Sequence, residues 1–298
     1  MISRPREDGL SEVVGFVLLL ALIVVALSLY QVYGVPAAGR ENEIAHMNAV
    51  KDRFVDYKIA LDGLWVNERS GVLLSTAFDL GTGAAKTGGG AFTIPILTPA
   101  GSGGTVSVKS GGAKLKIEAG EKSATIPLGS LSYTSSNNYW VDQTWTYQMG
   151  AVFLSQDGGT AVRVGPSIAA TKTGNDNIAL SVVPIRLDGS ATIAGSGPVR
   201  VETRMRWSEP FPLNGEYDEV NLFVEAGDLV TAGAWERAFG EVRQRAQNEG
   251  VDPSRLSIER SGNTVTLNIQ PQIGKKVILN VYPASYTVTI HNAASLVE

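Results

Sequence analysis

The sequence predicts a mainly β protein with one long helix at its N-terminus. Three observations support this: an uninterrupted apolar run over residues 13–33, an amphipathic segment behind it, and short alternating strands with glycine-rich turns from about Ser70 onward. We expect a helix that is half membrane-embedded and half amphipathic, followed by an antiparallel β-sandwich-like head with one helix in its C-terminal half. The expected segments are a leader at 1–9, a transmembrane or assembly helix at 10–35, an amphipathic stalk helix at 36–69 and a head at 70–298.

The apolar run is long enough to cross a lipid bilayer. As a helix, residues 13–33 extend about 30 Å, which matches the hydrocarbon core of a membrane. Tyr30 and Tyr33 then fall at the outer interface, where aromatic rings with a polar tip are favoured. We expect the lipid-facing side chains to include Val13, Phe16, Leu20, Val24, Leu27 and Tyr30. Arg4 and Arg6 favour a cytoplasmic N-terminus and hence a head outside the cell.

A short charged leader precedes this run. The stretch "REDG" before "LSEVVGFVLLLALIVVA" resembles the class III signal of archaeal type IV pilin-like proteins. That resemblance implies that a prepilin peptidase cuts after Gly9, that Leu10 becomes the mature N-terminus, and that the apolar helix stays with the protein. A small, flexible residue such as Gly9 suits an extended segment entering a protease cleft. A secretory signal peptide cleaved after Ala37, with Val35 at −3, and an uncleaved anchor remain alternatives.

Glu12 is a carboxylate at the edge of the apolar helix. By the same resemblance it is a candidate assembly contact that neutralises the N-terminal amine of a neighbouring subunit, although it is third rather than fifth after the proposed cut. The alternative is a first-turn glutamate that the helix dipole favours.

The stalk segment carries one apolar stripe. Gly34, Pro36 and Gly39 predict a kink or a break before it. Glu43 and Asp52 are expected on the polar side, whereas Ile59 and Val66 broaden the stripe. The stripe either packs only on the head of its own chain or contacts other subunits. The expected stripe residues are Ile44, Met47, Val50, Phe54, Tyr57 and Leu61.

The head reads as strands with polar and apolar alternation. A hairpin turn is expected at "ERSGNTV" and a helix over "AWERAFGEVRQRAQNEG", with Trp235, Phe239 and Val242 on its buried face. Expected strands are 105–110, 113–119, 146–155, 160–164, 177–187, 199–207, 219–226, 255–260, 264–270 and 276–282. The aromatic-rich stretch 138–168, together with "AWERAF", resembles the ectodomain of an uncharacterised archaeal family of pilin-like membrane proteins.

The composition argues against most catalytic and nucleic-acid functions. The net charge is −4, cysteines number 0 and histidines 2. We therefore expect no enzyme, no catalytic residues, no cofactor, no metal and no nucleic-acid partner. "GTGAAKTGGG" fails the phosphate-loop pattern, and "SQDGG" and "NDN" are read as turns. Arg237, Arg243 and Arg245 are read as a solvated helix face.

Two function classes remain. The first is a pilin-like structural or adhesive surface subunit, inserted in the membrane, processed by prepilin peptidase and assembled with itself or with other pilin-like subunits into a filament. The second is a non-polymerising anchored ectodomain that binds a glycan, metal or partner protein, with Trp140 and Trp145 as a candidate aromatic platform. A carboxylate pair of the glycosidase type stays open, because spacing along the chain does not exclude it.

Overall fold

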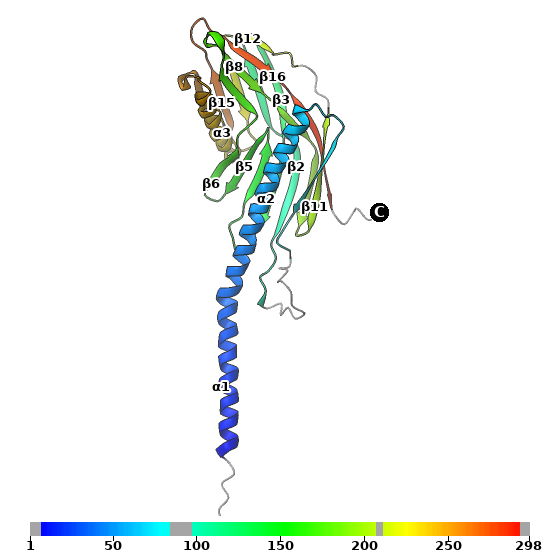
Figure 1. Cartoon of the computed structure of the whole chain (residues 1–298), viewed down its shortest axis with the longest axis vertical. Helices are drawn as coiled ribbons and strands as arrows, with labels where there is room; N and C mark the ends of the chain where they lie inside the picture. The colour runs from blue at the N-terminus through cyan, green and yellow to red at the C-terminus, as the bar shows by residue number, and fades with distance from the viewer. Residues whose placement is uncertain (1–6, 84–96, 207–210, 293–298) are drawn as a thin grey trace, which may run out of the picture.

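The molecule is a long helical rod that runs up one side of a β-rich head (Figure 1). The computed structural model describes residues 7–83, 97–206 and 211–292, and describes side chains from Glu12 onward. The rod consists of helix α1 (Glu7–Leu29), a π-helical turn η1 (Tyr30–Gly34) and helix α2 (Val35–Val66). The expected fold class, a long N-terminal helix before a largely antiparallel β head, is confirmed.

The strands of the described residues form three hydrogen-bonded sheets. The central sheet has the order β14-β15-β13-β2-β3-β4-β5-β6, with β10 paired to β2. Its strands are β2 (Gly103–Ala119), β3 (Lys122–Ser136), β4 (Thr144–Gln148), β5 (Ala151–Gln156), β6 (Gly159–Val164), β10 (Ser190–Gly195), β13 (Val220–Glu225), β14 (Leu256–Ser261) and β15 (Thr264–Ile269).

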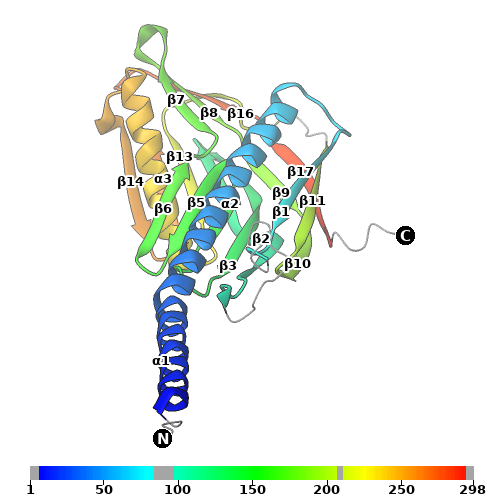
Figure 2. The same ribbon diagram turned by 60° about the horizontal axis from the view of Figure 1, so that its bottom comes forward.

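Two smaller sheets flank the central one. The sheet β1-β11-β17-β9, here called the stalk-side sheet, lies near α2, and the sheet β12-β16-β8-β7, the distal sheet, lies away from the N-terminal rod (Figures 1 and 2). The stalk-side strands are β1 (Leu73–Asp79), β9 (Ile185–Asp188), β11 (Pro198–Arg206) and β17 (Ala284–Asn292). The distal strands are β7 (Ile168–Lys172), β8 (Ile178–Val182), β12 (Gly215–Tyr217) and β16 (Val277–Val281). Short 3-10 turns η3 (Gly174–Asp176) and η4 (Pro253–Arg255) and helix α3 (Leu229–Asn248) complete the elements.

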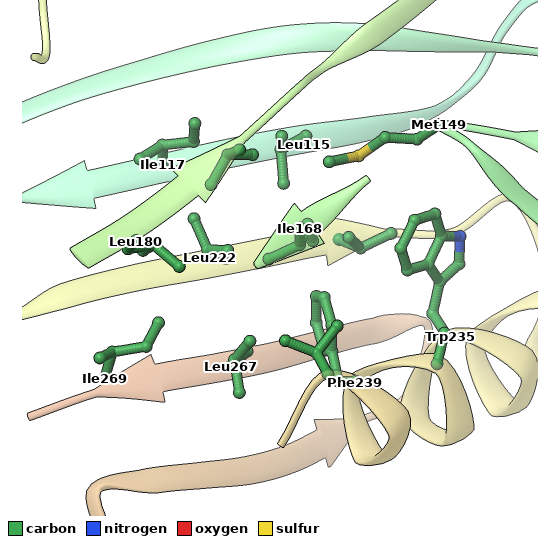
Figure 3. Packing of buried hydrophobic residues seen from close by; sticks show 14 of the residues in the cluster. Leu115, Ile117, Met149, Ile168, Leu180, Leu222, Trp235, Phe239, Leu267 and Ile269 are labelled. Carbon is green, nitrogen blue, oxygen red and sulfur yellow. The ribbon is translucent and has the colours of Figure 1, made fainter. Parts of the chain in front are cut away.

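The central sheet has a hydrophobic core on each face. On one face, α3 and the distal sheet enclose the α3 core, which contains Trp235 and Phe239 beside Leu222 and Leu267 (Figure 3). On the other face, α2 and the stalk-side sheet enclose the α2 core. Strand β5 shows this division residue by residue, because Phe153 belongs to the α3 core while its neighbours belong to the α2 core. Successive side chains of a strand point to opposite faces, so the buried residues of β5, Ala151 to Leu154, are all apolar, whereas Ser155 and Gln156 at its end are not buried.

Several expected strands have different boundaries in the structure. The two strands expected at 105–110 and 113–119 are one strand, β2, with a register shift between Lys109 and Ala113. The strand expected at 146–155 is a hairpin, β4–β5, because Met149 and Gly150 both have positive φ and turn the chain. Strands β1, β3, β7, β10, β12 and β17 were not expected from the sequence.

The strand expected at 177–187 is divided between two sheets. Pro184 supplies no N–H for a ladder, and the chain passes there from β8 in the distal sheet to β9 in the stalk-side sheet. The segment around Pro283 does the same from β16 to β17. The two segments run side by side, so β16 pairs with β8 and β17 pairs with β9 in parallel. These two parallel pairs depart from the antiparallel pairing expected for the head.

The expected C-terminal-half helix is confirmed as α3. Trp235, Phe239 and Val242 are buried, and Asp228 caps the helix by accepting from the backbone N–H of Thr231. The indole Nε1 of Trp235 donates to Gln148 Oε1 at 2.7 Å, which satisfies a polar atom deep in the core.

Candidate membrane anchor and its junction with the head

Helix α1 presents apolar side chains on all sides and packs on no other part of the described chain. Every side chain from Glu12 to Tyr33 is exposed, including Leu18 at 65% and Tyr33 at 71%. A helix that is apolar all round without protein neighbours needs an apolar surrounding. This helix is long and apolar enough to span a membrane. All six expected lipid-facing residues, from Val13 to Tyr30, lie on this exposed rod.

The proposed cleavage site lies at the beginning of the rod. Gly9 and Leu10 are in the first turn of α1, which begins at Glu7 in the full-length chain, and their side chains are outside the described part. Glu12 is exposed and lies beyond that first turn, so the helix dipole of the full-length chain does not explain its position.

Of the kink or break expected at Gly34, Pro36 and Gly39, the break is absent, because the rod continues as helix through all three residues. The π-helical turn η1 replaces the break: the N–H of Val35 donates to the carbonyl of Tyr30, one residue farther than in an α-helix. Pro36 follows in the first turn of α2, where a missing N–H is tolerated. A Cβ on Gly34 would lie 2.7 Å from the ring of Tyr30, so a larger residue there requires this exposed ring to move.

Helix α2 packs one face on the head of its own chain. The stripe expected from the sequence is confirmed for Met47, Val50, Phe54, Tyr57 and Leu61, which are buried, whereas Ile44 is half-buried. Ile59 and Val66 were expected to broaden the stripe, but they are 63% and 67% exposed. The stripe therefore packs against the head of the same chain, and the opposite face of α2 stays open.

Glu43 was expected on the polar side, and this is wrong. Its side chain is 1% exposed and lies in the buried stripe four residues before Met47. One carboxylate oxygen accepts from the backbone N–H of Asn138 at 2.7 Å, and the other accepts from that of Tyr139 at 2.8 Å. These bonds clamp the β3–β4 loop onto the rod. The spacing of Glu43 within the apolar stripe was the only sequence signal for this contact.

The residues beside Glu43 complete the clamp. The ring of Tyr139 lies against Gly39, where a Cβ would approach it to 2.3 Å, and its hydroxyl accepts from the N–H of Ala100 at 3.0 Å. The guanidinium of Arg40 lies 4.4 Å from the ring centroid of Trp140, a cation–π contact. The head thus grips α2 a few residues after the apolar rod ends.

His46 lies one turn above Glu43. Its Nε2 is 3.1 Å from the hydroxyl of Tyr133, which in turn donates to the carbonyl of Leu80. Burial lowers the pKa of His46 from its ordinary value of 6.5, and the carboxylates of Asp79 and Glu43 oppose this only in part. The imidazole is therefore neutral at pH 7.

A buried tyrosine cluster holds the upper half of α2. The hydroxyl of Tyr57 is 2.9 Å from Thr203 Oγ1, and that of Tyr286 donates to the carbonyl of Leu61 at 2.9 Å. The rings of Tyr57 and Tyr147 meet edge to face with centroids 5.4 Å apart. Burial raises the pKa of all three phenols, so they stay protonated, and the hydroxyls of Tyr57 and Tyr286 serve as hydrogen-bonding anchors.

The other candidate sites are not brought together. Within residues 12–83, 97–206 and 211–292, the structure holds no group of three or more His, Cys, Asp or Glu residues that could bind a metal. "SQDGG" is the β5–β6 turn, and Asp176 of "NDN" pairs with Lys172 at 2.7 Å. Most of "GTGAAKTGGG" lies outside the described residues. Arg245 donates to the carbonyl of Pro166, while Arg237 and Arg243 are exposed.

The candidate aromatic platform is not formed, and the alternative of burial in the core holds for Trp145. Trp145 is buried at 2% exposure in the α2 core, with its Nε1 donating to Gln143, and Trp140 is half-buried under Arg40. The two rings therefore do not present a common surface. The alternation of β4, which buries Trp145 together with Tyr147, was the sequence signal against it.

Residues 99–270 match a family described as a family of unknown function (DUF7289). The match covers more than half of the chain. The chain belongs to this family. The DUF7289 region runs from just before β2 to just after β15, so it includes the central sheet and α3 and leaves out α1 and α2. No curated protein and no solved structure matches the chain.

Proposed function

We propose that the protein is a pilin-like structural or adhesive subunit of the cell surface. Helix α1 inserts in the membrane, the N-terminus lies in the cytoplasm, and the head lies outside the cell. The observation that carries this proposal is the rod itself: the 22 consecutive residues from Glu12 to Tyr33 are exposed and almost all apolar, and α2 then packs on the head. Exposed apolar surface of this extent needs lipid or other helices around it.

The leader fits processing by a prepilin peptidase. The proposed cut after Gly9 removes the charged residues Arg4, Arg6, Glu7 and Asp8 and leaves a mature chain that starts at Leu10. The apolar helix is then retained. A secretory signal peptidase that cuts after Ala37 would remove it. Retention of the helix is what makes assembly possible, because the rod is then available to neighbouring copies.

Assembly would bring the α1 rods of many copies together. Between helices in lipid the drive is side-chain packing and paired polar groups rather than apolar burial, since lipid is already apolar. Glu12 would be the polar group at this contact, where an N-terminal amine of another subunit can neutralise it. The outer face of α2, with Ile59 and Val66 exposed, would extend the contact between subunits above the membrane.

Electron microscopy of sheared cell-surface fractions tests assembly, with an antibody to the head as the label. Labelled filaments are expected. A Gly9→Val variant should keep its leader and form no filaments, because a β-branched side chain obstructs the cleavage position. Gly15→Ala is the matched control, since a Cβ there meets nothing within 4 Å, and it should be processed normally.

Protein that stays in the membrane fraction as single subunits would contradict polymerisation and favour the second candidate, a non-polymerising anchored ectodomain with a ligand. One observation favours keeping that candidate. The head carries a polar hollow that neither the anchor nor the clamp uses.

A further inference from the structure

A polar hollow lies on the central sheet where strands β14, β15 and β13 run side by side. It occupies about 380 Å³ on the face opposite the α3 core. Because side chains alternate along a strand, the apolar residues Leu222 and Leu267 point into the core while their neighbours point out. The lining residues are Asn221, Phe223, Ser257, Glu259, Thr266, Asn268 and Gln270.

The strand register arranges these residues in two rows. In one row Ser257 pairs with Asn268, which pairs with Asn221. In the next row Glu259 pairs with Thr266, which pairs with Phe223. Directly paired residues on one face lie about 5 Å apart, so the two rows present their side chains at a regular spacing to a ligand that lies across the strands.

The amide groups of one row are held in fixed positions. Asn221 Nδ2 donates to Glu219 Oε1 at 3.0 Å, and Asn268 Nδ2 donates to the same oxygen and to Asn221 Oδ1 at 2.6 Å. Hydrogen bonds from Asn221, and further ones from Gln270 and Asn268, lower the pKa of Glu219, so its carboxylate is charged at neutral pH. Groups held in this way lose little entropy when a ligand binds.

Phe223 is the aromatic residue of the hollow. It is half-buried on a face whose other lining residues are polar, and its neighbour Lys116 holds its ammonium 5.7 Å from the ring centroid. Lys116 is also paired with Glu118 at 2.6 Å. The ring therefore forms the apolar part of an otherwise hydrogen-bonding surface, a combination that fits a ligand with one apolar face and a polar edge.

We propose that this hollow binds a neutral carbohydrate. A pyranose ring offers a C–H face that can stack on Phe223 and hydroxyl pairs that both donate and accept, as carboxamides and carboxylates require. The carboxylates of Glu259, Glu219 and Glu118 outnumber the ammonium of Lys116 and disfavour an anionic ligand, and the polar lining disfavours a purely apolar one. The hollow also lacks the ligand set of a cation site, because no group of three or more His, Cys, Asp or Glu residues that could hold a metal occurs among the described residues.

This inference deepens the second candidate function and places its ligand on the sheet face instead of at Trp140 and Trp145. It needs only a folded head that faces the outside of the cell. A failure of carbohydrate binding is distinguishable from a failure of the proposed membrane anchor, because the N-terminal residue and the membrane retention of the same preparation are measured separately.

Isothermal titration of the full-length protein tests the proposal, in a detergent without a sugar headgroup. The probes are neutral linear tetrasaccharides of glucose, mannose and N-acetylglucosamine. At least one should bind, and Asn268→Ala and Phe223→Thr should each weaken that binding by tenfold or more. Tyr282→Ala removes an exposed aromatic side chain elsewhere on the head and should leave binding unchanged.

Two further measurements complete the test. Binding should be insensitive to sodium chloride, because the ligand is uncharged. Melting temperatures of the variants should stay close to that of the wild type, and Phe223→Thr keeps a residue suited to a strand if Asn268→Ala does not fold. The proposal is overturned if no tetrasaccharide binds, if binding survives both substitutions, or if calcium chloride binds in the hollow and tetrasaccharides do not.

Discussion

Replacing Glu43 by alanine should loosen the rod from the head. The substitution removes two charged acceptors from the backbone N–H groups of Asn138 and Tyr139, which lie 2.7 and 2.8 Å away. A hydrogen bond to a charged group contributes about 1.5–3 kcal/mol. The β3–β4 loop, which carries the two N–H groups, is partly open to water, so the lower end of this range applies to each bond. Glu43→Ala should therefore lower the free energy of unfolding by about 3 kcal/mol in all. For a head of this size that corresponds to a fall of about 6–12 °C in the melting temperature.

Thermal unfolding of the full-length protein in detergent, followed by circular dichroism, measures this effect. Glu41→Ala is the matched control, because Glu41 is an exposed glutamate on the same helix two residues earlier. Glu43→Gln keeps one acceptor oxygen and should fall between the two. If Glu43→Ala and Glu41→Ala melt within about 1 °C of each other, the carboxylate does not hold the β3–β4 loop and the clamp is wrong.

Three further predictions concern the same junction. Gly39→Ala should lower the melting temperature, because the new methyl group meets the ring of Tyr139. Gly63→Ala lies in open space on the same helix and should raise the free energy of unfolding by about 0.5–1 kcal/mol. Equal effects of the two substitutions on the melting temperature would refute the close approach of Tyr139 to Gly39. Burial lowers the pKa of His46, so on acidification the unfolded state binds a proton before the folded state does, and the free energy of unfolding should fall as the pH drops below 6.5. In denaturant titrations at several pH values, His46→Gln should make the free energy of unfolding depend less on pH. An unchanged pH dependence would exclude His46 as its cause. A double-mutant cycle of Tyr57→Phe and Thr203→Val should give a coupling of about 1 kcal/mol in denaturant unfolding, and strict additivity would mean that their 2.9 Å contact contributes nothing.

The periodic parts of the chain were predictable from the sequence. The stalk stripe from Met47 to Leu61 and the buried face of α3 follow from helical spacing, because a core on one side selects apolar residues at every third or fourth position. The apolar rod was predictable for the same reason, since lipid on all sides requires apolar residues on all sides.

The unpredicted features depend on distant partners. Whether Glu43 faces water or the core is decided by the N–H groups of Asn138 and Tyr139, 95 and 96 positions away. The division of 177–187 between two sheets at Pro184 depends on the parallel partner around Pro283. The hollow around Phe223 was missed because each of its strands shows only ordinary alternation, and the rows form when β14, β15 and β13 pair.

The N-terminal residue of the mature protein tests the central claim most directly. Intact-mass and N-terminal peptide analysis of the protein extracted from membranes of the native cells should show a chain that starts at Leu10 and keeps α1. A chain that starts at Met1 would show an unprocessed anchor, and a chain that starts at Ala38 in the soluble fraction would show a cleaved signal peptide. Either result would contradict a retained, trimmed rod that carries the head on the cell surface.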